Sequence, residues 1–482
     1  MPEEDIVNRH ASNNANTINR RWTRYPVTYR KQEMHTIARW IVNGDSGSVV
    51  GLPGVGRSTL LEFLYHRPDA LAQYLPAASP AIAIIPVDLN ILPDYSVATL
   101  YRVILRSFNQ ARHQFSDESV RQDIWTQYDE YKTTTDPFLA QDALWNILKE
   151  SEKREIRIVW VLNRYDEFCQ VATPEMVRTL RGLRDRFKHT LCYLVGMLQE
   201  VTYLPDSDVV EPLHDILDVN VCWVGCLTTA DAGKMVLREL RATTVEEADV
   251  NRIVQLTGGH PVLIRVTCNW WLSSSNKPPP AEWAGTLLAQ RKTKRRLERI
   301  WNNLTQEEQF AVAELQKIQL WPPQRKKEAQ RILKQHQFTL LQLQKKGICR
   351  QAQSEWQLFS TLFTQYVAQV AGRGRGRIWL DKDTDELYQG QTVIDGLTYL
   401  ERSALHFFVE QPHMRHTHSD IIEAVWPQDV QKEGVTTETL YQAIRGVRKK
   451  IEPNPSKPVY VLNWRGQPEG GYRFFPEGRP AE

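Results

Sequence analysis

Apolar runs of strand length alternate with helical patterns through residues 34–271. The runs SVVG, AIAIIPVDL, IRIVWVL, LCYLVGM and VCWV are short and nearly continuous, and amphipathic stretches such as RSTLLEFLYH and EMVRTLRGLRDRF lie between them. Continuous apolar runs are typical of strands buried on both faces, and their alternation with helices indicates a parallel sheet covered by helices. The pattern predicts an α/β fold for this half of the chain.

The pattern becomes helical in residues 295–370. Thr305 and Glu308 stand three residues apart before an apolar run, which is the spacing of a capping box. The stretch LLQLQKKGICRQAQSEWQLFSTLFTQYV then predicts a helix, a two-stranded wing and a closing helix. We therefore expect a lid that ends in a winged-helix-like domain, with a plain helical lid as the alternative.

Residues 378–475 combine short strands with three helical patterns. RIWLDKDTDELYQGQTVI alternates like antiparallel strands, and Thr398 and Glu401 form a capping box at the first helix. HSDIIEAVWP and TTETLYQAIRGVRKKIE predict two further helices, and VYVLNWRG with GGYRFF predicts a closing hairpin. This order of elements predicts a winged helix-turn-helix domain.

Composition and charge limit the classes of protein that fit. The 482 residues carry a formal net charge of +3, which is too small to indicate a nucleic-acid binder on its own. Basic residues gather locally instead, in RKTKRR at 291–296 and RGVRKK at 445–450, and the first run reads equally well as a solvated helix face. Without a signal peptide or an apolar run of roughly 18 residues, a cytoplasmic protein without a membrane partner is expected. Six scattered cysteines predict reduced packing residues.

A glycine-rich loop, GLPGVGRST at residues 51–59, follows the strand SVVG and opens a helix. This is the context of the G-x-x-x-x-G-K-[ST] motif, in which backbone N–H groups wrap phosphates at a helix N-terminus. Ser58 takes the position whose hydroxyl meets Mg²⁺, while Arg57 replaces the usual lysine with a planar fork of different reach. The predicted nucleotide-binding residues of this loop are Gly51, Gly54, Gly56, Arg57, Ser58 and Thr59.

The second acidic element of such sites is degenerate. IRIVWVL ends in Asn163 and Arg164, where an aspartate that holds the magnesium shell is expected. Asp166 and Glu167 follow shortly after and are the weak candidates for the catalytic role. The sequence therefore predicts binding of ATP or ADP, with Mg²⁺ held through Ser58, and slow or absent hydrolysis.

Residues 29–370 resemble the STAND branch of AAA-like NTPases. Besides the glycine loop, the resemblance rests on VDL at 87–89, LTTADA at 227–232 and TGGHP at 257–261. It implies that His260 and Pro261 belong to a lid close to the nucleotide, whereas a histidine that merely holds a turn is the alternative for His260. Relatives often carry a long repeat sensor, which this chain lacks, so a signalling partner protein is expected, as is a homo-oligomer.

Residues 378–475 resemble the OmpR/PhoB-type effector domain of response regulators. The matching landmarks are LTYLE at 397–401, VW at 425–426, IRGVRKKI at 444–451, RG at 465–466 and GYRF at 471–474. The resemblance implies that the basic helix enters the major groove of double-stranded DNA and the wing reaches the minor groove; packing of this helix against another protein is the alternative. Gly446 departs from the pattern, and close approach of DNA to its backbone is one explanation. The implied DNA-binding residues are Tyr441, Arg445, Arg448, Lys449, Asn463 and Arg465.

Breaks in composition divide the chain further. SSSNKPPP ends the α/β pattern, and AGRGRGR indicates a flexible basic linker. The expected domains are an N-terminal arm at 1–28, a P-loop NTPase core at 29–220, a helical lid with the GGHP motif at 221–294, an internal winged-helix-like domain at 295–370, the linker at 371–377 and the OmpR/PhoB-type domain at 378–482.

Two functions fit these motifs, besides that of a scaffold whose inactive nucleotide site merely holds the fold together. The first is a transcriptional regulator in which a degenerate, STAND-like nucleotide module controls the C-terminal winged helix. The alternative is a DNA-associated AAA-like ATPase, a loader or adaptor in transposition, replication or defence. HMRHTH at 413–418 is a weak metal candidate because no companion cysteine accompanies it.

Overall fold

The computed structural model describes residues 21–204, 209–241, 243–274, 276–319, 331, 333–352, 355–370, 376–390, 392–426, 436–452, 455–456, 458–466 and 469–478. The predicted N-terminal arm up to position 20 and positions 371–375 of the predicted linker lie outside these residues. The chain divides into two compact units, Met1–Lys277 with Lys345–Ile348, and Pro278–Gln344 with Cys349–Glu482. Buried apolar residues form separate clusters in the two units.

A five-stranded parallel sheet forms the centre of the first unit, as the sequence predicts. Its strands are β1 (Gly47–Val50), β2 (Ala81–Pro86), β3 (Ile156–Asn163), β4 (Leu191–Met197) and β5 (Val221–Trp223), in the order β2-β3-β4-β1-β5. Every residue of β1 and β4 is buried, which explains their continuous apolar sequences. Because β1 lies between β4 and β5, the loop after β1 leaves the sheet beside the end of β4.

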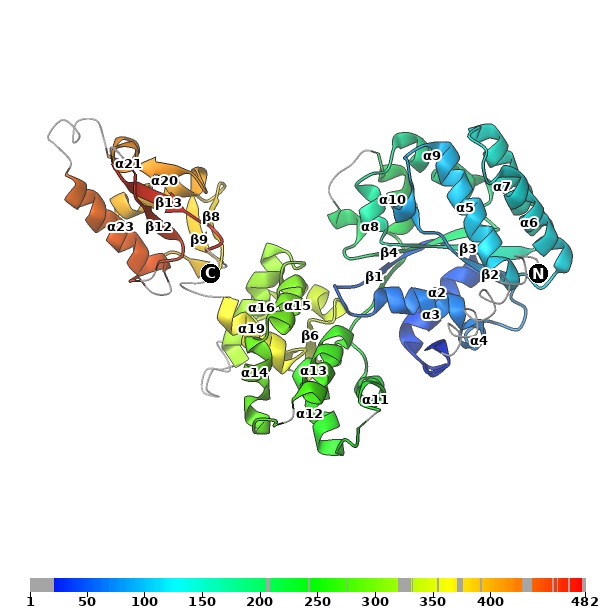
Figure 1. Ribbon diagram of the computed structural model, residues 1–482, viewed down its shortest axis with the longest axis horizontal. Helices are drawn as coiled ribbons and strands as arrows, with labels where there is room; N and C mark the ends of the chain where they lie inside the picture. The colour runs from blue at the N-terminus through cyan, green and yellow to red at the C-terminus, as the bar shows by residue number, and fades with distance from the viewer. Residues whose placement is uncertain are drawn as a thin grey trace, which may run out of the picture. The chain divides into compact units, whose positions relative to one another are not determined.

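Helices cover both faces of this sheet. Figure 1 shows α5, α7 and α9 on one side and α2 and α3 on the other. The core includes Trp160 of β3, whose ring stacks on Tyr193 at 5.5 Å between centroids. The helices of the unit are α2 (Lys31–Asn43), α3 (Arg57–His66), α4 (Pro68–Ala72), α5 (Val97–Ala111), α6 (Glu118–Tyr131), α7 (Pro137–Lys153), α8 (Tyr165–Cys169), α9 (Pro174–Arg186), α10 (Glu211–Leu217), α11 (Thr229–Glu239), α12 (Glu247–Thr257) and α13 (Pro261–Ser273).

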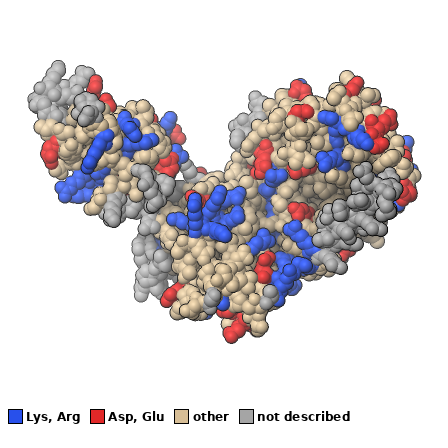
Figure 2. Space-filling view, viewed as in Figure 1, with Lys and Arg blue, Asp and Glu red and all other residues tan. Residues whose placement is uncertain are grey.

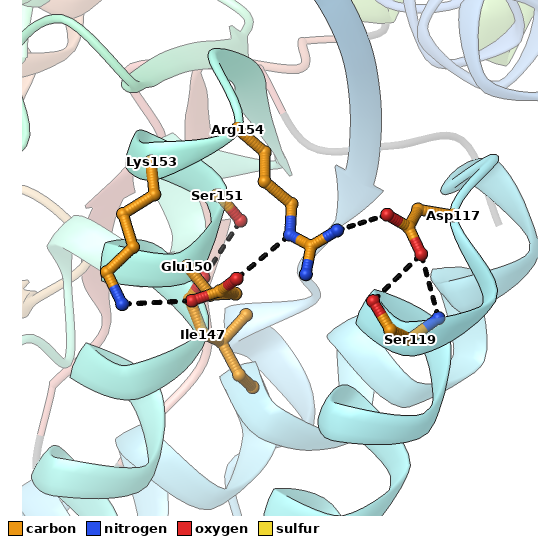
Figure 3. Close-up of polar contacts among 7 residues, drawn as sticks. All are labelled: Asp117, Ser119, Ile147, Glu150, Ser151, Lys153 and Arg154. Atoms are coloured by element: carbon orange, nitrogen blue, oxygen red, sulfur yellow. Dashed lines mark hydrogen bonds and ion pairs between the residues drawn. The ribbon is translucent and has the colours of Figure 1, made fainter.

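A polar clamp joins the start of α6 to the end of α7 (Figure 3). Asp117 caps α6 by accepting hydrogen bonds from the backbone N–H and the hydroxyl of Ser119, both at 2.8 Å. Arg154 contacts the same carboxylate and donates from Nε to Glu150 at 2.9 Å. One guanidinium thus joins α6 and α7, the last two of the three α-helices that connect β2 to β3.

The second unit begins with a helical part that carries a small wing. Thr305 and Glu308 form the predicted capping box, with the Thr305 N–H donating to the Glu308 carboxylate at 3.0 Å. The predicted succession of helix, two strands and helix is observed, and the predicted boundary at 294/295 falls inside α15. The elements are α14 (Trp283–Ala289), α15 (Arg291–Trp301), α16 (Gln306–Gln319), α18 (Gln337–Lys345), β6 (Cys349–Ala352), β7 (Glu355–Leu358) and α19 (Thr361–Val370).

The C-terminal domain has the predicted winged-helix elements. Two antiparallel sheets, β10-β9-β8 and β11-β13-β12, flank three helices. The Thr398–Glu401 capping box is present at the start of α20. The elements are β8 (Ile378–Asp381), β9 (Glu386–Gln389), β10 (Thr392–Val393), α20 (Tyr399–Glu410), β11 (Arg415–Thr417), α21 (His418–Val425), α23 (Thr437–Ile451), β12 (Val461–Trp464) and β13 (Gly471–Phe474).

The cysteines and the apolar helices bear on two further expectations. All six cysteines are free thiols, and Cys192, Cys222, Cys268 and Cys349 are buried. Burial raises the pKa of the Cys192 thiol to about 12, so this side chain packs as a small neutral group. Among the helices of the described residues, none has both the length and the apolar character that crossing a membrane requires.

Candidate functional site

The glycine loop leaves β1 and opens directly into α3. Gly54 and Gly56 have φ values of +83° and +100°, a left-handed conformation that glycine adopts without strain. Gly56 is the N-cap residue of α3 and supplies no side chain to cap it. The first N–H groups of α3 therefore face the loop, which is the arrangement that binds anions at a helix N-terminus.

Arg57, the residue that replaces the motif lysine, is buried with only 8% of its surface exposed. Its Nε and Nη1 atoms have no hydrogen-bond partner among the residues that the structure describes. Burial lowers the pKa of Arg57, and the negative charges of Asp166 and Glu167 oppose that shift. A buried guanidinium with unused donors is unfavourable unless an anion joins it, so Arg57 is suited to receive a phosphate.

Ser58 and Asn163 meet at the ends of α3 and β3. The Ser58 hydroxyl donates to Asn163 Oδ1 at 3.3 Å, and the same oxygen accepts from the Arg164 N–H at 3.1 Å. Both groups that face the metal position of the motif are therefore neutral. Because Mg²⁺ is usually bound through carboxylates and phosphates, this pair fits the ion only weakly.

The chain turns sharply after Asn163, which places the two weak catalytic candidates near the loop. Arg164 has a φ of +57°, and α8 begins at the next residue with Asp166 and Glu167 in its first turn. Asp166 Oδ2 accepts from the Leu198 N–H at 3.4 Å, and Glu167 pairs with Arg164 at 3.3 Å. The sequence did not show whether the chain extends or turns after Asn163. The left-handed conformation of Arg164 makes it turn and places the two carboxylates near the glycine loop.

The GGHP motif lies against the glycine loop. Gly259 has a φ of +78°, and a Cβ on it would overlap the backbone oxygen of Leu227. The Val262 N–H donates to the Gly54 oxygen at 3.2 Å, so helix α13 is bonded to the loop. His260 is 3% exposed, and burial together with the charge of Arg30 lowers its pKa to about 3. The structure thus brings His260 and Pro261 to the loop, with the imidazole neutral.

Arg30 is a residue of this site that sequence reasoning missed. It is buried, and its guanidinium donates to the backbone oxygens of Val55 and Gly225, each at 2.6 Å. Its third partner is the Glu33 carboxylate at 2.9 Å. Arg30 therefore ties the glycine loop to the start of the lid. No motif marks it, because two of its three partners are backbone oxygens from distant parts of the chain.

A basic cavity of about 560 Å³ opens beside Gly56, Thr59 and Pro261. The Arg238 guanidinium lies 4.4 Å from the centre of the Tyr25 ring. Two of the cations have nearby acids, at 3.8 Å for Lys234 with Asp231 and 3.8 Å for Arg265 with Glu239. The sequence did hold a signal, since Lys234 and Arg238 stand four residues apart on α11 and Arg241 follows shortly after the helix ends. The cations that line the cavity are Arg24, Lys234, Arg238, Arg241 and Arg265.

The second candidate site is a groove of about 800 Å³ in the C-terminal domain, between α23 and the β12–β13 hairpin. The apolar residues Leu440, Ile444, Val447 and Ile451 bury one face of α23. The opposite face is exposed at Arg445 and Lys449, and Tyr441 is 42% exposed. All the residues implied by the resemblance, Tyr441, Arg445, Arg448, Lys449, Asn463 and Arg465, line this groove.

Arg448 differs from the other cations of the groove. Its Nη2 donates to the Val461 oxygen and to Asn463 Oδ1, each at 2.6 Å, and Nε also donates to Val461 at 3.1 Å. The guanidinium lies 5.5 Å from the Tyr472 ring, and burial lowers its pKa. Arg448 therefore fixes the wing to α23, while Arg445 projects into the groove.

Gly446 has an explanation within the protein. A Cβ on Gly446 would overlap the Glu401 carboxylate, which belongs to the capping box of α20. The expectation that DNA accounts for this glycine is therefore unnecessary, because α20 already approaches the helix at this point. The weak metal candidate at 413–418 gains no support, since the described residues contain no group of three His, Cys, Asp or Glu side chains that could hold a metal ion.

Comparison with protein families identifies the C-terminal domain. Residues 395–474 match the model of the family described as "Transcriptional regulatory protein, C terminal". The C-terminal domain is therefore a winged helix of the transcriptional-regulator type, and its predicted resemblance is confirmed. No curated protein sequence matches the chain.

Solved structures resemble the chain only distantly. The ORC2 protein of Aeropyrum pernix, solved as ADPNP-ADP complexes, is 11% identical with a TM-score of 0.38, over 70% of this chain and 93% of that one. A Walker-type ATPase of Pyrococcus abyssi is 14% identical with a TM-score of 0.39, over 70% and 95%. Drosophila ORC bound to DNA is 12% identical with a TM-score of 0.35, over 72% and 88%. At these scores the likenesses determine neither the function nor the ligand of this chain.

Proposed function

We propose that this protein is a DNA-binding transcriptional regulator that also binds an adenine nucleotide. The observation that carries the proposal is the groove of the C-terminal domain. Six residues implied from sequence line one concave surface, within a domain that matches a transcriptional-regulator family. Exposed cations on a helix beside a hairpin suit a major-groove reader with phosphate contacts.

Within this groove, Arg445 and Lys449 contact the DNA and Arg448 holds the wing in place. Arg445 and Lys449 are exposed and form no ion pair with any residue in the described part of the chain. Arg448 instead uses its donors on Val461 and Asn463. DNA affinity therefore depends on the first two directly, and on Arg448 through the position of Asn463 and Arg465.

Replacing these arginines one at a time tests the assignment. Arg445→Ala leaves the melting temperature of the full chain unchanged and weakens duplex binding, because a base or phosphate contact is worth about 1–3 kcal/mol. Arg448→Ala lowers the melting temperature as well as DNA affinity, because it removes bonds inside the protein. Fluorescence anisotropy with labelled duplex measures the affinity. Duplex binding by the Arg445→Ala, Lys449→Ala double variant that equals wild type, with the same salt dependence, contradicts the proposal.

Nucleotide binding is supported by the chemistry of the first unit. The glycine loop presents the start of α3, Arg57 keeps two unused donors beside it, and the adjoining cavity is lined by cations. An anionic ligand such as ATP or ADP satisfies all three features. Mg²⁺ bound with the nucleotide would meet Ser58, and Asn163 beside it offers a neutral oxygen in place of a carboxylate.

The same geometry favours binding over turnover. Hydrolysis needs a metal that is held firmly and a group that orients the attacking water. Asp166 and Glu167 are the carboxylates whose charges act on Arg57, yet Asp166 is bonded to Leu198 and Glu167 to Arg164. We therefore assign the site a regulatory role, in which the bond from Val262 to Gly54 lets the lid respond to an occupied loop.

Isothermal titration of the full chain with ATP, ADP and Mg²⁺ tests this half of the proposal. Binding of either nucleotide with little phosphate release supports it. An absence of heat and of any thermal shift with both nucleotides contradicts nucleotide binding. Rapid hydrolysis that duplex DNA accelerates would instead favour a DNA-associated ATPase.

A further inference from the structure

Helix α15 of the second unit is attached to the protein by a narrow apolar stripe. Thr293, Leu297 and Ile300 are its buried residues, and the helix packs against α14 and α19. The remaining positions from Arg291 to Arg299 are exposed. Most of the circumference of this helix therefore faces solvent.

Five cations occupy the side of α15 opposite the buried stripe. At 3.6 residues per turn they fall within an arc of about 140° and extend over about 12 Å of helix. None of them forms an ion pair with another residue in the part of the chain that the structure describes. Figure 2 shows the patch of Lys and Arg over this helix. The five cations, called the α15 surface below, are Arg291, Lys292, Arg295, Arg296 and Arg299.

This arrangement differs from the solvated helix faces of the same protein. In α9, Arg178 pairs with Glu175 at 2.9 Å and Arg181 with Asp185 at 2.9 Å. The α15 surface instead places like charges four residues apart, as in Arg291 with Arg295, which destabilises a helix by a few tenths of a kcal/mol per pair. Such repulsion is relieved when an extended anion lies along the helix.

We propose that the α15 surface binds the phosphates of duplex DNA without reading its sequence, as a second contact beside the α23 groove. The inference rests on the proposed DNA-binding function. The length of the surface matches about three to four phosphates of one strand. Its side chains are all cations, which position a protein on DNA and do not select a base sequence as amide or hydroxyl side chains do.

Duplex DNA is the anion that the C-terminal domain of the same chain would bring to this surface. The C-terminal winged helix belongs to the same polypeptide, so once its groove engages a duplex, the local concentration of DNA near α15 is high. A weak, sequence-independent contact then adds to a specific one. The α15 surface raises affinity for all duplexes, while Arg445 and its neighbours decide which duplex is preferred.

The test removes three charges from the surface in the full-length protein. Because glutamine has nearly the helix propensity of lysine and arginine, Lys292→Gln, Arg296→Gln and Arg299→Gln together leave the melting temperature unchanged. Anisotropy with a duplex of unrelated sequence is measured over a range of salt concentrations. The slope of log affinity against log salt concentration is negative in wild type. It becomes less steep by about 2–3 in the variant, since each lost phosphate contact reduces its magnitude by about 0.9.

A matched variant controls for net charge. Arg39→Gln, Arg106→Gln and Lys188→Gln remove three exposed cations from the first unit and leave the slope as in wild type. An unchanged slope in the α15 variant overturns the inference, as does an equal fall in the control. The same holds if the α15 variant loses binding to phosphatidylserine vesicles while its DNA slope is unchanged. If wild type binds no duplex at all, the regulator proposal fails as well.

Discussion

The Ser58 hydroxyl donates a hydrogen bond to Asn163 Oδ1 at 3.3 Å, across the ends of α3 and β3. In P-loop sites a hydroxyl and a carboxylate at these two positions share a metal ion. Here the second position holds the neutral amide of Asn163 instead of a carboxylate. Asn163 also accepts from the Arg164 N–H at 3.1 Å, so its oxygen is oriented toward the loop. If the loop binds a nucleotide as proposed, the identity of residue 163 therefore decides how firmly Mg²⁺ is held there.

Restoring the carboxylate tests that statement. In Asn163→Asp, Mg²⁺ strengthens ATP binding by roughly ten-fold more than it does in wild type, because a carboxylate is a far better ligand for the ion. Titration calorimetry with ATP in Mg²⁺ and in EDTA measures the difference. Asn163→Ala serves as the control and gains no dependence on Mg²⁺. Wild-type protein that already binds ATP only with Mg²⁺ would contradict the prediction.

Arg57 and Arg30 offer a contrast between two buried arginines of one site. Arg57 has unused donors within the described structure, whereas Arg30 donates to Val55, Gly225 and Glu33. Arg57→Met therefore leaves the melting temperature without nucleotide unchanged or higher. It lowers nucleotide affinity by roughly ten-fold or more, since a hydrogen bond to a charged group contributes about 1.5–3 kcal/mol.

Arg30→Met gives the opposite result for stability. It lowers the melting temperature without nucleotide, because three oxygens lose their donor. Differential scanning fluorimetry with and without ADP measures both variants. If Arg57→Met destabilises the protein as strongly as Arg30→Met while nucleotide affinity is unchanged, Arg57 is a structural residue and does not bind phosphate.

His260 makes stability depend on pH. Burial lowers its pKa to about 3 in the folded protein, while an unfolded histidine titrates near 6.5. Between these values only the unfolded chain binds the proton, so stability is full above about pH 6.5 and falls as the pH decreases. Between the two pKa values, and well below the unfolded one, this residue lowers the free energy of unfolding by about 1.4 kcal/mol for each pH unit of acidification.

The comparison of wild type with His260→Asn isolates that contribution. The melting temperature of the variant decreases less steeply between neutral and mildly acidic pH, although the variant is less stable near neutral pH. His66 and His214 also have pKa values lowered by burial, so they remain present in both proteins as a common background. Parallel pH profiles for the two proteins would show that His260 is accessible to protons in the fold.

The sequence predicted those parts of the molecule that depend on local patterns. Apolar runs identified the parallel sheet because β1 and β4 are buried on both faces. The spacing of Thr398 and Glu401 predicted a capping box, which depends on neighbouring residues only. The landmarks near Arg445 likewise placed the groove residues on one surface.

What the sequence did not predict depends on contacts between distant residues. Arg30 contacts the glycine loop of the candidate site through backbone oxygens of Val55 and Gly225, and such acceptors leave no mark in a sequence. Arg448 lies on the helix face that the family resemblance implies for DNA contact, and its bond to Val461 in another element was not predicted. Periodicity gives the direction of a side chain on its helix and does not give its partner.

Gly446 shows how such a contact decides the identity of a residue. Alanine in a helix interior is favoured over glycine by about 1 kcal/mol. A Cβ at this position, however, would overlap the Glu401 carboxylate, which caps α20 by accepting from the Thr398 N–H at 2.8 Å. Gly446→Ala therefore gains helix propensity and loses the cap, which contributes about 0.5–2 kcal/mol. The single variant is expected to be as stable as wild type or slightly less stable.

A double-mutant cycle separates the two effects. In a Glu401→Ala background there is no carboxylate to displace, so Gly446→Ala stabilises the protein by about 1 kcal/mol. Urea unfolding of the four proteins gives the coupling free energy. The clash is shown if Gly446→Ala is more stabilising in the Glu401→Ala background than in wild type. If Gly446→Ala stabilises both backgrounds equally and weakens duplex binding, DNA itself approaches the helix backbone at this glycine. Equal stabilisation with unchanged DNA affinity would mean that Glu401 moves aside at no cost.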